Sequence, residues 1–282
     1  MLAHSIEIIY NEIQKRILRA GDVGRVMEIR IIVAAHKKYW MPQDSVYLPL
    51  QVGAAGKEPL GFQTDDTGDN ISQYNPYYCE LTGLYWAWKN LSCDTVGLCH
   101  YRRYFAHRTL ARSPEKKKRA IFHKKDYEVL LRKYDVIVPE KRHYYIETVR
   151  SQYEHAHHKR DLELVEQIIA ARYPAYKDAF VSVMERRSLY LWNMFVMDKK
   201  RFDAYCTWLF DILFLLEPSV NLKDYNSYEA RVFGFLAERL WNVWLEKQHL
   251  RTVEVPVVML EDVNWPRKIG RFMKRKFNHM EE

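Results

Sequence analysis

Short, uninterrupted apolar runs separated by longer helical segments constrain the fold of this chain more than any other feature. The run 29–35, IRIIVAA, is apolar except for Arg30, as in a central parallel strand that is buried on both faces. Further apolar runs lie at 95–99, 135–138, 191–197 and 253–259. Helical segments are predicted near 75–91, 123–133, 148–187 (broken at Pro174), 199–216 and 227–248. Strands that alternate with helices predict an α/β domain with a mostly parallel sheet flanked by helices.

Composition narrows the class of protein. With 282 residues, 48% of them hydrophobic, the chain can bury a sizeable core. A net charge of +8 favours an anionic partner, such as a nucleotide, a nucleic acid or a membrane surface. The four cysteines form no CxxC pair, which indicates reduced thiols in the cytosol. No apolar run approaches the length of a membrane span and no signal peptide is evident, so we expect a cytoplasmic protein.

Two terminal segments are predicted to lie outside a main domain at 27–265. Residues 1–26 consist of apolar positions at helical spacing and a glycine-containing linker, which predicts an amphipathic helix that docks on the domain or on a second copy. In 266–282, six basic residues and no acidic one lie between Arg267 and Lys276, around an apolar stripe. This pattern is typical of an interfacial helix and predicts attachment to the inner face of the cell membrane. A tail packed on the body of the protein is the alternative.

The strongest local signal for chemistry is HYRRY, 100–104, which directly follows the apolar run 95–99. Ligands of open α/β sheets bind at the carboxyl ends of the strands. Arginine presents a planar fork that grips phosphate oxygens in a bidentate manner. His100, Arg102 and Arg103 therefore predict a diphosphate site, with a solvated basic turn as the alternative.

Other motifs are absent or weak. The chain has no GxGxxG, P-loop, GxSxG or HExxH motif. No motif therefore indicates a dehydrogenase, a P-loop NTPase, a serine hydrolase or a zincin. The segment DDTGDN, 65–70, favours turn chemistry and binding of ligand hydroxyls over a metal loop, because it lacks the EF-hand spacing. The segment EHAHHKRD, 154–161, lacks a third and fourth zinc ligand and reads as a solvated helix face. We predict neither a metal nor a cofactor.

Four motifs in the same order carry a resemblance to a known family: IIVAAHKKYW, DDTGDNIS, CELTGLYWAWKN and GLCHYRRYF. They resemble a domain of bacterial capsular, exopolysaccharide and O-antigen gene clusters, long of unknown function and now associated with galactofuranosyl transfer. The likeness spans about residues 27–277. A more distant resemblance is to sugar-nucleotide transferases of the GT-A fold, in which an Asp-x-Asp holds a metal on the donor diphosphate. Here His100-Tyr101-Arg102 occupies that place, which implies that cations replace the metal.

The resemblance also implies roles for individual residues. His36 would meet the nucleotide, and Asp66, Asp69 and Asn70 would bind base, ribose or sugar hydroxyls. The donor sugar would lie against Glu80 and Asn193, and the diphosphate against His100, Tyr101, Arg102 and Arg103. Inversion at the anomeric carbon, also implied, needs a general base. Glu229 is one candidate for it, and Asp66 and Glu80 stay open.

These observations predict a glycosyltransferase that moves galactofuranose from a uridine diphosphate donor to a lipid-linked glycan. One alternative is a pyranose donor. Another is a non-enzymatic nucleic-acid binder, with basic residues on phosphates and aromatic residues on bases. The positive charge is spread along the chain and acidic residues lie near the predicted site, so we expect no nucleic-acid partner.

Overall fold

A nine-stranded mixed sheet forms the centre of the computed structural model, which describes residues 27–110 and 112–261. The strand order is β10-β6-β9-β4-β1-β2-β3, with β5 attached to β4 and β11 attached to β5. The strands are β1 (Ile29–Ala35), β2 (Tyr47–Gln51), β3 (Gln63–Thr64), β4 (Thr95–His100), β5 (Arg103–Phe105), β6 (Val136–Pro139), β9 (Phe195–Asp198), β10 (Thr252–Val255) and β11 (Val257–Met259). A separate two-stranded sheet pairs β7 (Arg142–His143) with β8 (Ser188–Leu189).

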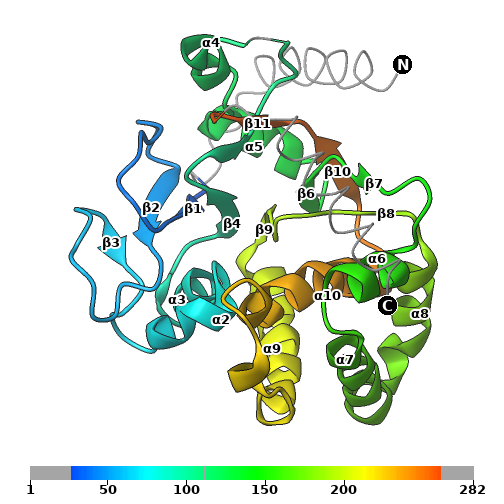
Figure 1. The fold of residues 1–282 in the computed structure, drawn as a ribbon. Helices are drawn as coiled ribbons and strands as arrows, with labels where there is room; N and C mark the ends of the chain where they lie inside the picture. Colours follow the sequence, from blue (N-terminus) through cyan, green and yellow to red (C-terminus); the bar gives the residue numbers. More distant parts are fainter. Residues whose placement is uncertain (1–26, 111, 262–282) are drawn as a thin grey trace.

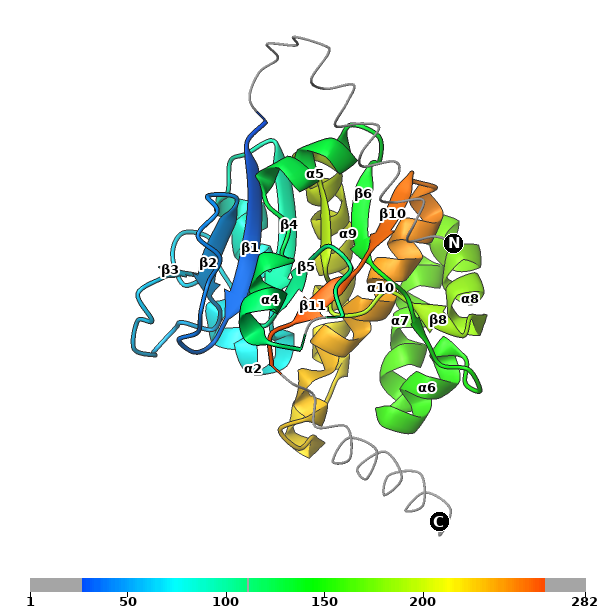
Figure 2. The ribbon, with the colours of Figure 1, turned by 90° about the horizontal axis from the view of Figure 1, so that it is seen from above.

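Helices cover both faces of the central sheet (Figures 1 and 2). They are α2 (Asn75–Tyr78), α3 (Leu81–Asn90), α4 (Pro114–Arg119), α5 (Lys124–Leu131), α6 (Val149–Ala156), α7 (Lys159–Arg172), α8 (Lys177–Glu185), α9 (Lys199–Leu216) and α10 (Val232–Gln248). Helices α3, α9 and α10 lie on one face and α5 on the other. Each face has its own hydrophobic cluster, the larger one under α3, α9 and α10.

The apolar run 29–35 is the central strand β1, as its sequence predicts. Ile32 points into the larger cluster, whereas Ile31 and Val33 point into the smaller one. Strand β4 lies beside it, and a Cβ at Gly97 would come within 2.7 Å of Ile31 and 2.8 Å of Val196. Glycine at this position therefore lets β1 and β9 pack closely around β4. The predicted α/β fold with helices on a mostly parallel sheet is confirmed.

The direction of β9 is the main departure from a fully parallel sheet. Strand β1 runs parallel to β2 and β4, and β6 runs parallel to β10, but β9 lies antiparallel between β4 and β6. Because β9 is reversed, its amino end lies at the sheet edge where β1 and β4 have their carboxyl ends. The residues just before Phe195 therefore reach the edge at which ligands of such sheets bind.

Four predicted elements are interrupted in the structure. The helix predicted at 148–187 is broken not only near Pro174 but also at 157–158, between α6 and α7. The helix predicted at 75–91 is split at Cys79, which adopts φ +52°. The strand predicted at 191–197 begins only at Phe195, because Trp192 and Asn193 form a turn with φ of +72° and +53°. The strand predicted at 253–259 is divided at Pro256, which has no N–H for a continuous ladder. Each interruption is a local backbone geometry that hydrophobic periodicity does not report.

The terminal segments predicted at 1–26 and 266–282 lie outside the described residues, and so do their predicted roles in self-association and membrane binding. Within 27–110 and 112–261, no helix combines the length and apolar character needed to cross a membrane.

Candidate active site

A pocket of about 670 Å³ lies at the carboxyl ends of β1 and β4. Strand β1 leads into His36 and β4 ends in His100, while α2, the 79–80 break and the start of α10 close the other sides. The lining residues with polar or aromatic side chains are His36, Asn75, Tyr77, Cys79, Glu80, His100, Tyr101, Arg102, Arg103, Trp192, Ser227, Arg231 and Glu238. Six of the residues predicted from sequence therefore share one pocket: His36, Glu80, His100, Tyr101, Arg102 and Arg103.

The two arginines of the HYRRY motif differ in their surroundings. Arg102 donates to the Glu261 carboxylate across 2.7 Å, and Lys37 lies 3.4 Å from the same side chain. Arg103 forms no close ion pair among the described residues, although the Glu80 and Glu238 carboxylates act on it electrostatically, and its buried Nε has no hydrogen-bond partner there. The guanidinium instead lies over the Trp192 ring, 5.4 Å from its centroid, and burial lowers its pKa. An unpaired, partly buried cation in a pocket is an electrostatic site for an anion.

Glu80 and Asn193 form a polar pair at the pocket, although 113 positions separate them in the sequence. The Asn193 amide donates to Glu80 Oε1 across 2.9 Å. Asn193 is fully buried, and its own Oδ1 has no hydrogen-bond partner among the described residues. Glu80 lines the pocket directly, so its carboxylate is available to ligand hydroxyls while Asn193 holds it in place.

Left-handed backbone conformations cluster at this pocket. Cys79, Trp192 and Asn193 are three of the five non-glycine residues with positive φ in the described chain. Each such residue costs on the order of 1–3 kcal/mol, and strain of this kind gathers at functional sites. The 192–193 turn is held on both sides: the Trp192 N–H donates to Glu238 Oε1 across 2.8 Å, and the Trp192 carbonyl lies 2.7 Å from His100 Nε2.

The acidic loop is not brought to the pocket lining. Asp66 and Asp69 are exposed, and neither they nor Asn70 lines the pocket. Asp69 accepts a hydrogen bond from the Tyr85 hydroxyl, and Asn70 donates to the carbonyl of Gly68 within its own turn. The predicted turn chemistry thus accounts for the contact of Asn70, whereas the Asp69 carboxylate contacts α3 through Tyr85.

Glu229 also lies outside the pocket lining, although Ser227, Ala230 and Arg231 are part of it. Its carboxylate accepts from the N–H of Asn226, whose own Oδ1 accepts from the N–H of Glu229. This reciprocal pair is a capping box at the turn that leads into α10. The same carboxylate oxygen of Glu229, Oε2, lies 3.5 Å from His158 Nε2. In the observed conformation the Glu229 carboxylate is therefore engaged in the turn that leads into α10.

Several residues of the site were not predicted from the sequence. Glu238 lines the pocket, and its burial raises the pKa of its carboxyl group. The signal in the sequence was an isolated carboxylate within the apolar helix 232–245. Trp192 and Arg231 also line the pocket, the latter with its Nε 3.2 Å from Cys79 Sγ.

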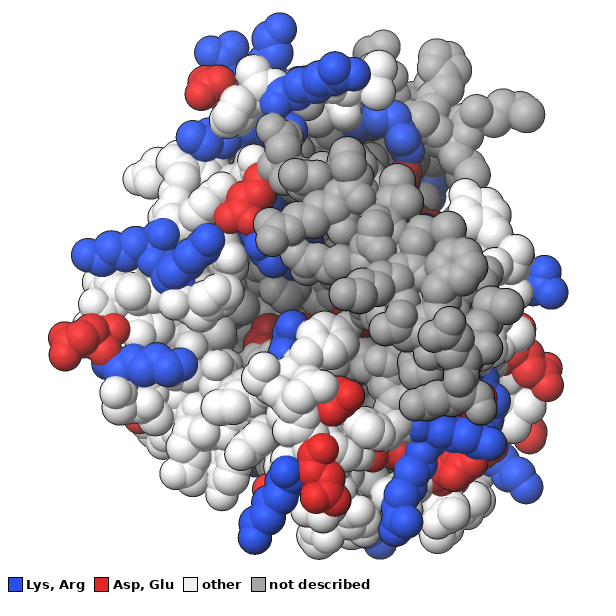
Figure 3. Space-filling model, viewed as in Figure 1, with Lys and Arg blue, Asp and Glu red and all other residues white. Residues whose placement is uncertain are grey.

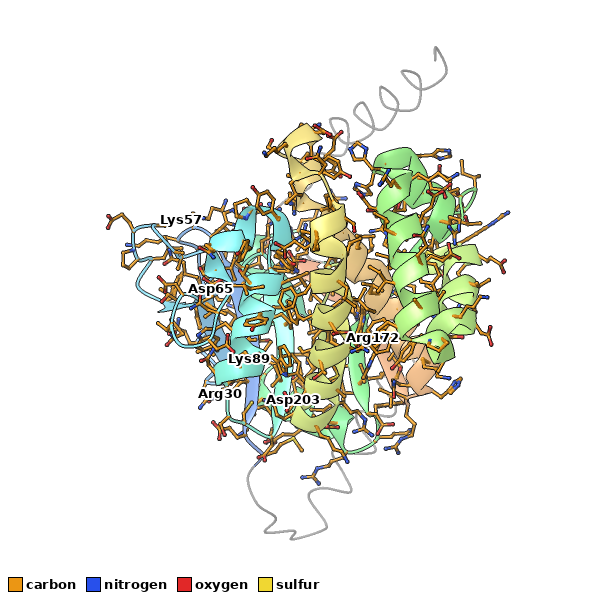
Figure 4. All side chains as sticks on the ribbon, turned by 90° about the horizontal axis from the view of Figure 1, so that it is seen from below. Arg30, Lys57, Asp65, Lys89, Arg172 and Asp203 are labelled. Atoms are coloured by element: carbon orange, nitrogen blue, oxygen red, sulfur yellow. The ribbon has the colours of Figure 1, made fainter. Side chains whose placement is uncertain are left out.

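Asp65, next to the predicted Asp66, is the structural carboxylate of the acidic loop. It is fully buried and accepts from the N–H groups of Gly53 and Ala54 and from the hydroxyls of Ser72 and Thr82. Figure 4 shows it beside α3, between that helix and the loop after β2. Because Val52 and Asn75 line the pocket beside these partners, Asp65 fixes one wall of the site.

We expect Glu261→Gln to strengthen binding of a diphosphate ligand by up to about fivefold, because exposed ion pairs contribute about 0–1 kcal/mol. The hydrogen bond from Arg102 holds the pKa of Glu261 below its usual value, so this carboxylate is ionised and competes for the cation. Titration calorimetry with uridine diphosphate measures the effect, and Glu254→Gln, which removes a carboxylate from another ion pair, is the matched control. Unchanged or weaker binding in Glu261→Gln would show that the pair does not compete with the ligand.

Comparisons with known proteins place these features in a family. The model of DUF4422, a domain of unknown function, matches residues 30–249. Among solved structures, the apo structure of the WbbM bifunctional glycosyltransferase matches with a TM-score of 0.77 and 31% sequence identity. The match covers 83% of this chain and 46% of that one, so the chain spans less than half of the glycosyltransferase. A search of curated protein sequences finds no match.

Proposed function

From the premise that this chain belongs to the DUF4422 family, we propose that it is a glycosyltransferase that uses a uridine diphosphate sugar. The proposal rests on one observation: the same pocket contains a cation, Arg103, that forms no close ion pair among the described residues, and a carboxylate, Glu80, that Asn193 holds in place. Arg103 offers charge to a leaving diphosphate, and Glu80, fixed by Asn193, offers hydrogen bonds to sugar hydroxyls. The shared fold with part of a bifunctional glycosyltransferase supports the same reaction class.

The proposed donor is uridine diphosphate galactofuranose and the proposed acceptor is a lipid-linked glycan of capsule, exopolysaccharide or O-antigen synthesis. The motif resemblance supports these finer assignments, and a pyranose donor is the alternative. Contact with a lipid-linked acceptor would bring the protein to the inner face of the cell membrane.

Stabilisation of the leaving diphosphate is assigned to the basic side chains. By the motif resemblance, His100, Tyr101 and Arg102 stand where many GT-A enzymes have the Asp-x-Asp that holds a metal. An imidazole, a phenol and a guanidinium do not supply the carboxylate oxygens that Mg²⁺ or Mn²⁺ prefers, so these three residues do not fit a metal on the diphosphate. Arg103, with Arg102 once Glu261 is displaced, would neutralise the charge that develops on the diphosphate.

An inverting transfer needs a group that removes the proton of the acceptor hydroxyl. Of the three candidates, Glu80 lines the pocket, whereas Asp66 and Glu229 do not. We therefore assign this role to Glu80. Glu238, also in the pocket, is bound to the Trp192 N–H and to Arg239, and we assign it the positioning of the 192–193 turn.

A nucleic-acid binder is the rival function, and the distribution of charge disfavours it. Surface cations are frequently paired, as Arg150 is with Glu166 and Arg186 is with Glu246. Along the lower edge of the face in Figure 3, acidic and basic side chains are interspersed. A nucleic-acid surface would instead present unpaired cations along the path of a phosphate backbone.

The proposal is tested with a panel of nucleotide sugars and an oligonucleotide control in thermal-shift assays. A ligand that binds only the folded state raises the melting temperature, and we expect selective stabilisation by uridine diphosphate sugars.

Transfer from the stabilising donor to a soluble glycan acceptor is then measured in excess chelator. Full activity in chelator is expected; activity that is lost and restored by Mn²⁺ or Mg²⁺ would contradict the metal-independent assignment. Stabilisation by the oligonucleotide alone would favour the rival function.

A further inference from the structure

His100 is held in one tautomer by the backbone. Its Nε2 lies 2.7 Å from the carbonyl oxygen of Trp192, and a carbonyl oxygen can only accept a hydrogen bond. Nε2 therefore carries a proton. In the neutral imidazole the second nitrogen, Nδ1, then holds a lone pair instead of a proton. Among the described residues, the contact between Nε2 and the Trp192 carbonyl is the hydrogen bond of this side chain, and His100 lines the pocket.

The backbone of Trp192, whose carbonyl fixes this tautomer, is itself held in place. Trp192 has a left-handed backbone, and its N–H is held by Glu238 from α10. Register pairing with Ala34 on β1 and Arg103 on β5 holds the backbone of His100 at the end of β4. The imidazole is thus held on one side by the sheet, through the backbone of His100, and on the other side by α10, through Glu238 and Trp192. The ring therefore keeps Nδ1 in one direction and has little freedom to flip and exchange the positions of its two nitrogens.

The charges around His100 oppose its protonation while the pocket holds no anion. Burial is the largest cause that lowers its pKa, and Arg103 and Arg102 add to the effect, while Glu80 acts in the opposite direction. Titratable and charged groups share the pocket from β1, α2, the α2–α3 break, the β4–β5 turn, and α10 with the turn before it. They are His36, Tyr77, Cys79, Glu80, Tyr101, Arg102, Arg103, Arg231 and Glu238. Free of ligand, His100 is therefore neutral near pH 7.

A bound diphosphate favours the protonated form of His100 instead of the neutral form. A neutral Nδ1 presents a lone pair, which repels a phosphate oxygen, whereas a protonated Nδ1 donates a charge-assisted hydrogen bond to it. We propose that His100 takes up one proton from solvent at Nδ1 when the diphosphate binds, and enters the complex as an imidazolium bonded to the diphosphate and to the Trp192 carbonyl. This inference rests on the proposed function and adds a proton to the donor-binding step. No proton is taken from the ligand, because the diphosphate of a nucleotide sugar has no ionisable proton near neutral pH.

The sign of the pH dependence follows from linkage. The pKa of His100 is low in the free protein and is raised by the bound diphosphate. Between these two values, binding takes up a proton and donor affinity falls by up to about tenfold per pH unit as the pH rises. Below the lower value His100 is already protonated, and above the higher value it stays neutral, so affinity is independent of this group in both ranges.

The test is titration calorimetry with uridine diphosphate galactofuranose, without acceptor, in two buffers of different ionisation enthalpy between pH 6 and 8. The dependence of the measured heat on the buffer gives the number of protons taken up, and we expect a value approaching one. Binding with no proton uptake anywhere in this range would overturn the inference and leave the proposed function standing. No binding of any uridine diphosphate sugar would instead overturn the proposed function.

Two variants identify the residue that takes up the proton. His100→Gln keeps a donor for the Trp192 carbonyl and should abolish the uptake, whereas His143→Gln, at an exposed position outside the pocket lining, should retain it. Uptake that survives in His100→Gln or disappears in His143→Gln would contradict the assignment. Nitrogen NMR of ¹⁵N-histidine-labelled wild-type protein provides the same answer without a variant that must fold. For His100 we expect a proton on Nε2 alone in the free protein and on both ring nitrogens in the complex.

Discussion

Replacing Arg103 with alanine is expected to lower kcat for sugar transfer by ~10²–10³, the usual scale for removing one preorganised charge stabiliser. The reason is that Arg103 has no ion-pair partner among the described residues and is partly buried, so its field acts on the ligand with little screening. The loss should appear in kcat, because the charge on the leaving diphosphate grows in the transition state. Arg103→Lys keeps the charge but loses the planar fork and should recover part of the activity.

Arg102→Ala provides the comparison within the same motif. Arg102 is paired with Glu261 and half-exposed, so part of its charge is already compensated, and we expect a smaller loss than for Arg103→Ala. Melting curves of both variants separate a catalytic effect from a folding defect, since Arg103 also packs on the Trp192 ring. Near-normal turnover in a folded Arg103→Ala protein would show that this guanidinium is only a surface charge.

Replacing Asp65 with alanine is expected to destabilise the protein by about 3–5 kcal/mol, the scale for removing one member of a buried charged network. The carboxylate accepts four hydrogen bonds, and its removal leaves two backbone N–H groups and the Ser72 hydroxyl without an acceptor in a region closed to water, while the Thr82 hydroxyl keeps only the Cys79 carbonyl. For a chain of this size each kcal/mol lowers the Tm by about 2–4 °C, so a decrease of roughly 10 °C is expected in calorimetry.

Asp66→Ala is the matched control, one residue away in the same loop. Its carboxylate is exposed, and surface substitutions usually change stability by less than about 0.5 kcal/mol. The two variants have the same composition and differ only in which carboxylate is removed. Equal melting temperatures for Asp65→Ala and Asp66→Ala would show that the buried hydrogen-bond network does not hold this wall of the pocket.

The sequence alone was sufficient for the architecture of the sheet centre and for one half of the site. The apolar run of β1 can be buried only between two helical layers, and polar residues that directly follow two parallel strands must meet at one edge. His36 and the HYRRY residues therefore come together from local pattern and strand direction. These are properties of single segments, and each segment carries its own signal.

The other half of the site depended on tertiary structure. The motif resemblance named Glu80 and Asn193 together, but their hydrogen bond forms because β9 runs antiparallel to β4, and no local pattern reports the direction of a short apolar strand. The choice of Asp65 over Asp66 as the buried carboxylate is made by which side of the turn faces α3, and both residues have the same chemistry in the sequence.

Glu229 and Glu238 illustrate the same limit. Glu229 lies in the turn before α10 and Glu238 lies within that helix, and of the two only Glu229 was named from the sequence, as one candidate base. The backbone N–H of Asn226 lies beside Glu229 and takes it into a capping box, while the strained turn at Trp192 places an N–H in front of Glu238. Residue type and spacing thus determined which groups could carry the chemistry. Packing between segments far apart in the chain decided which of them face the pocket, because burial and hydrogen-bond geometry are properties of the assembled fold.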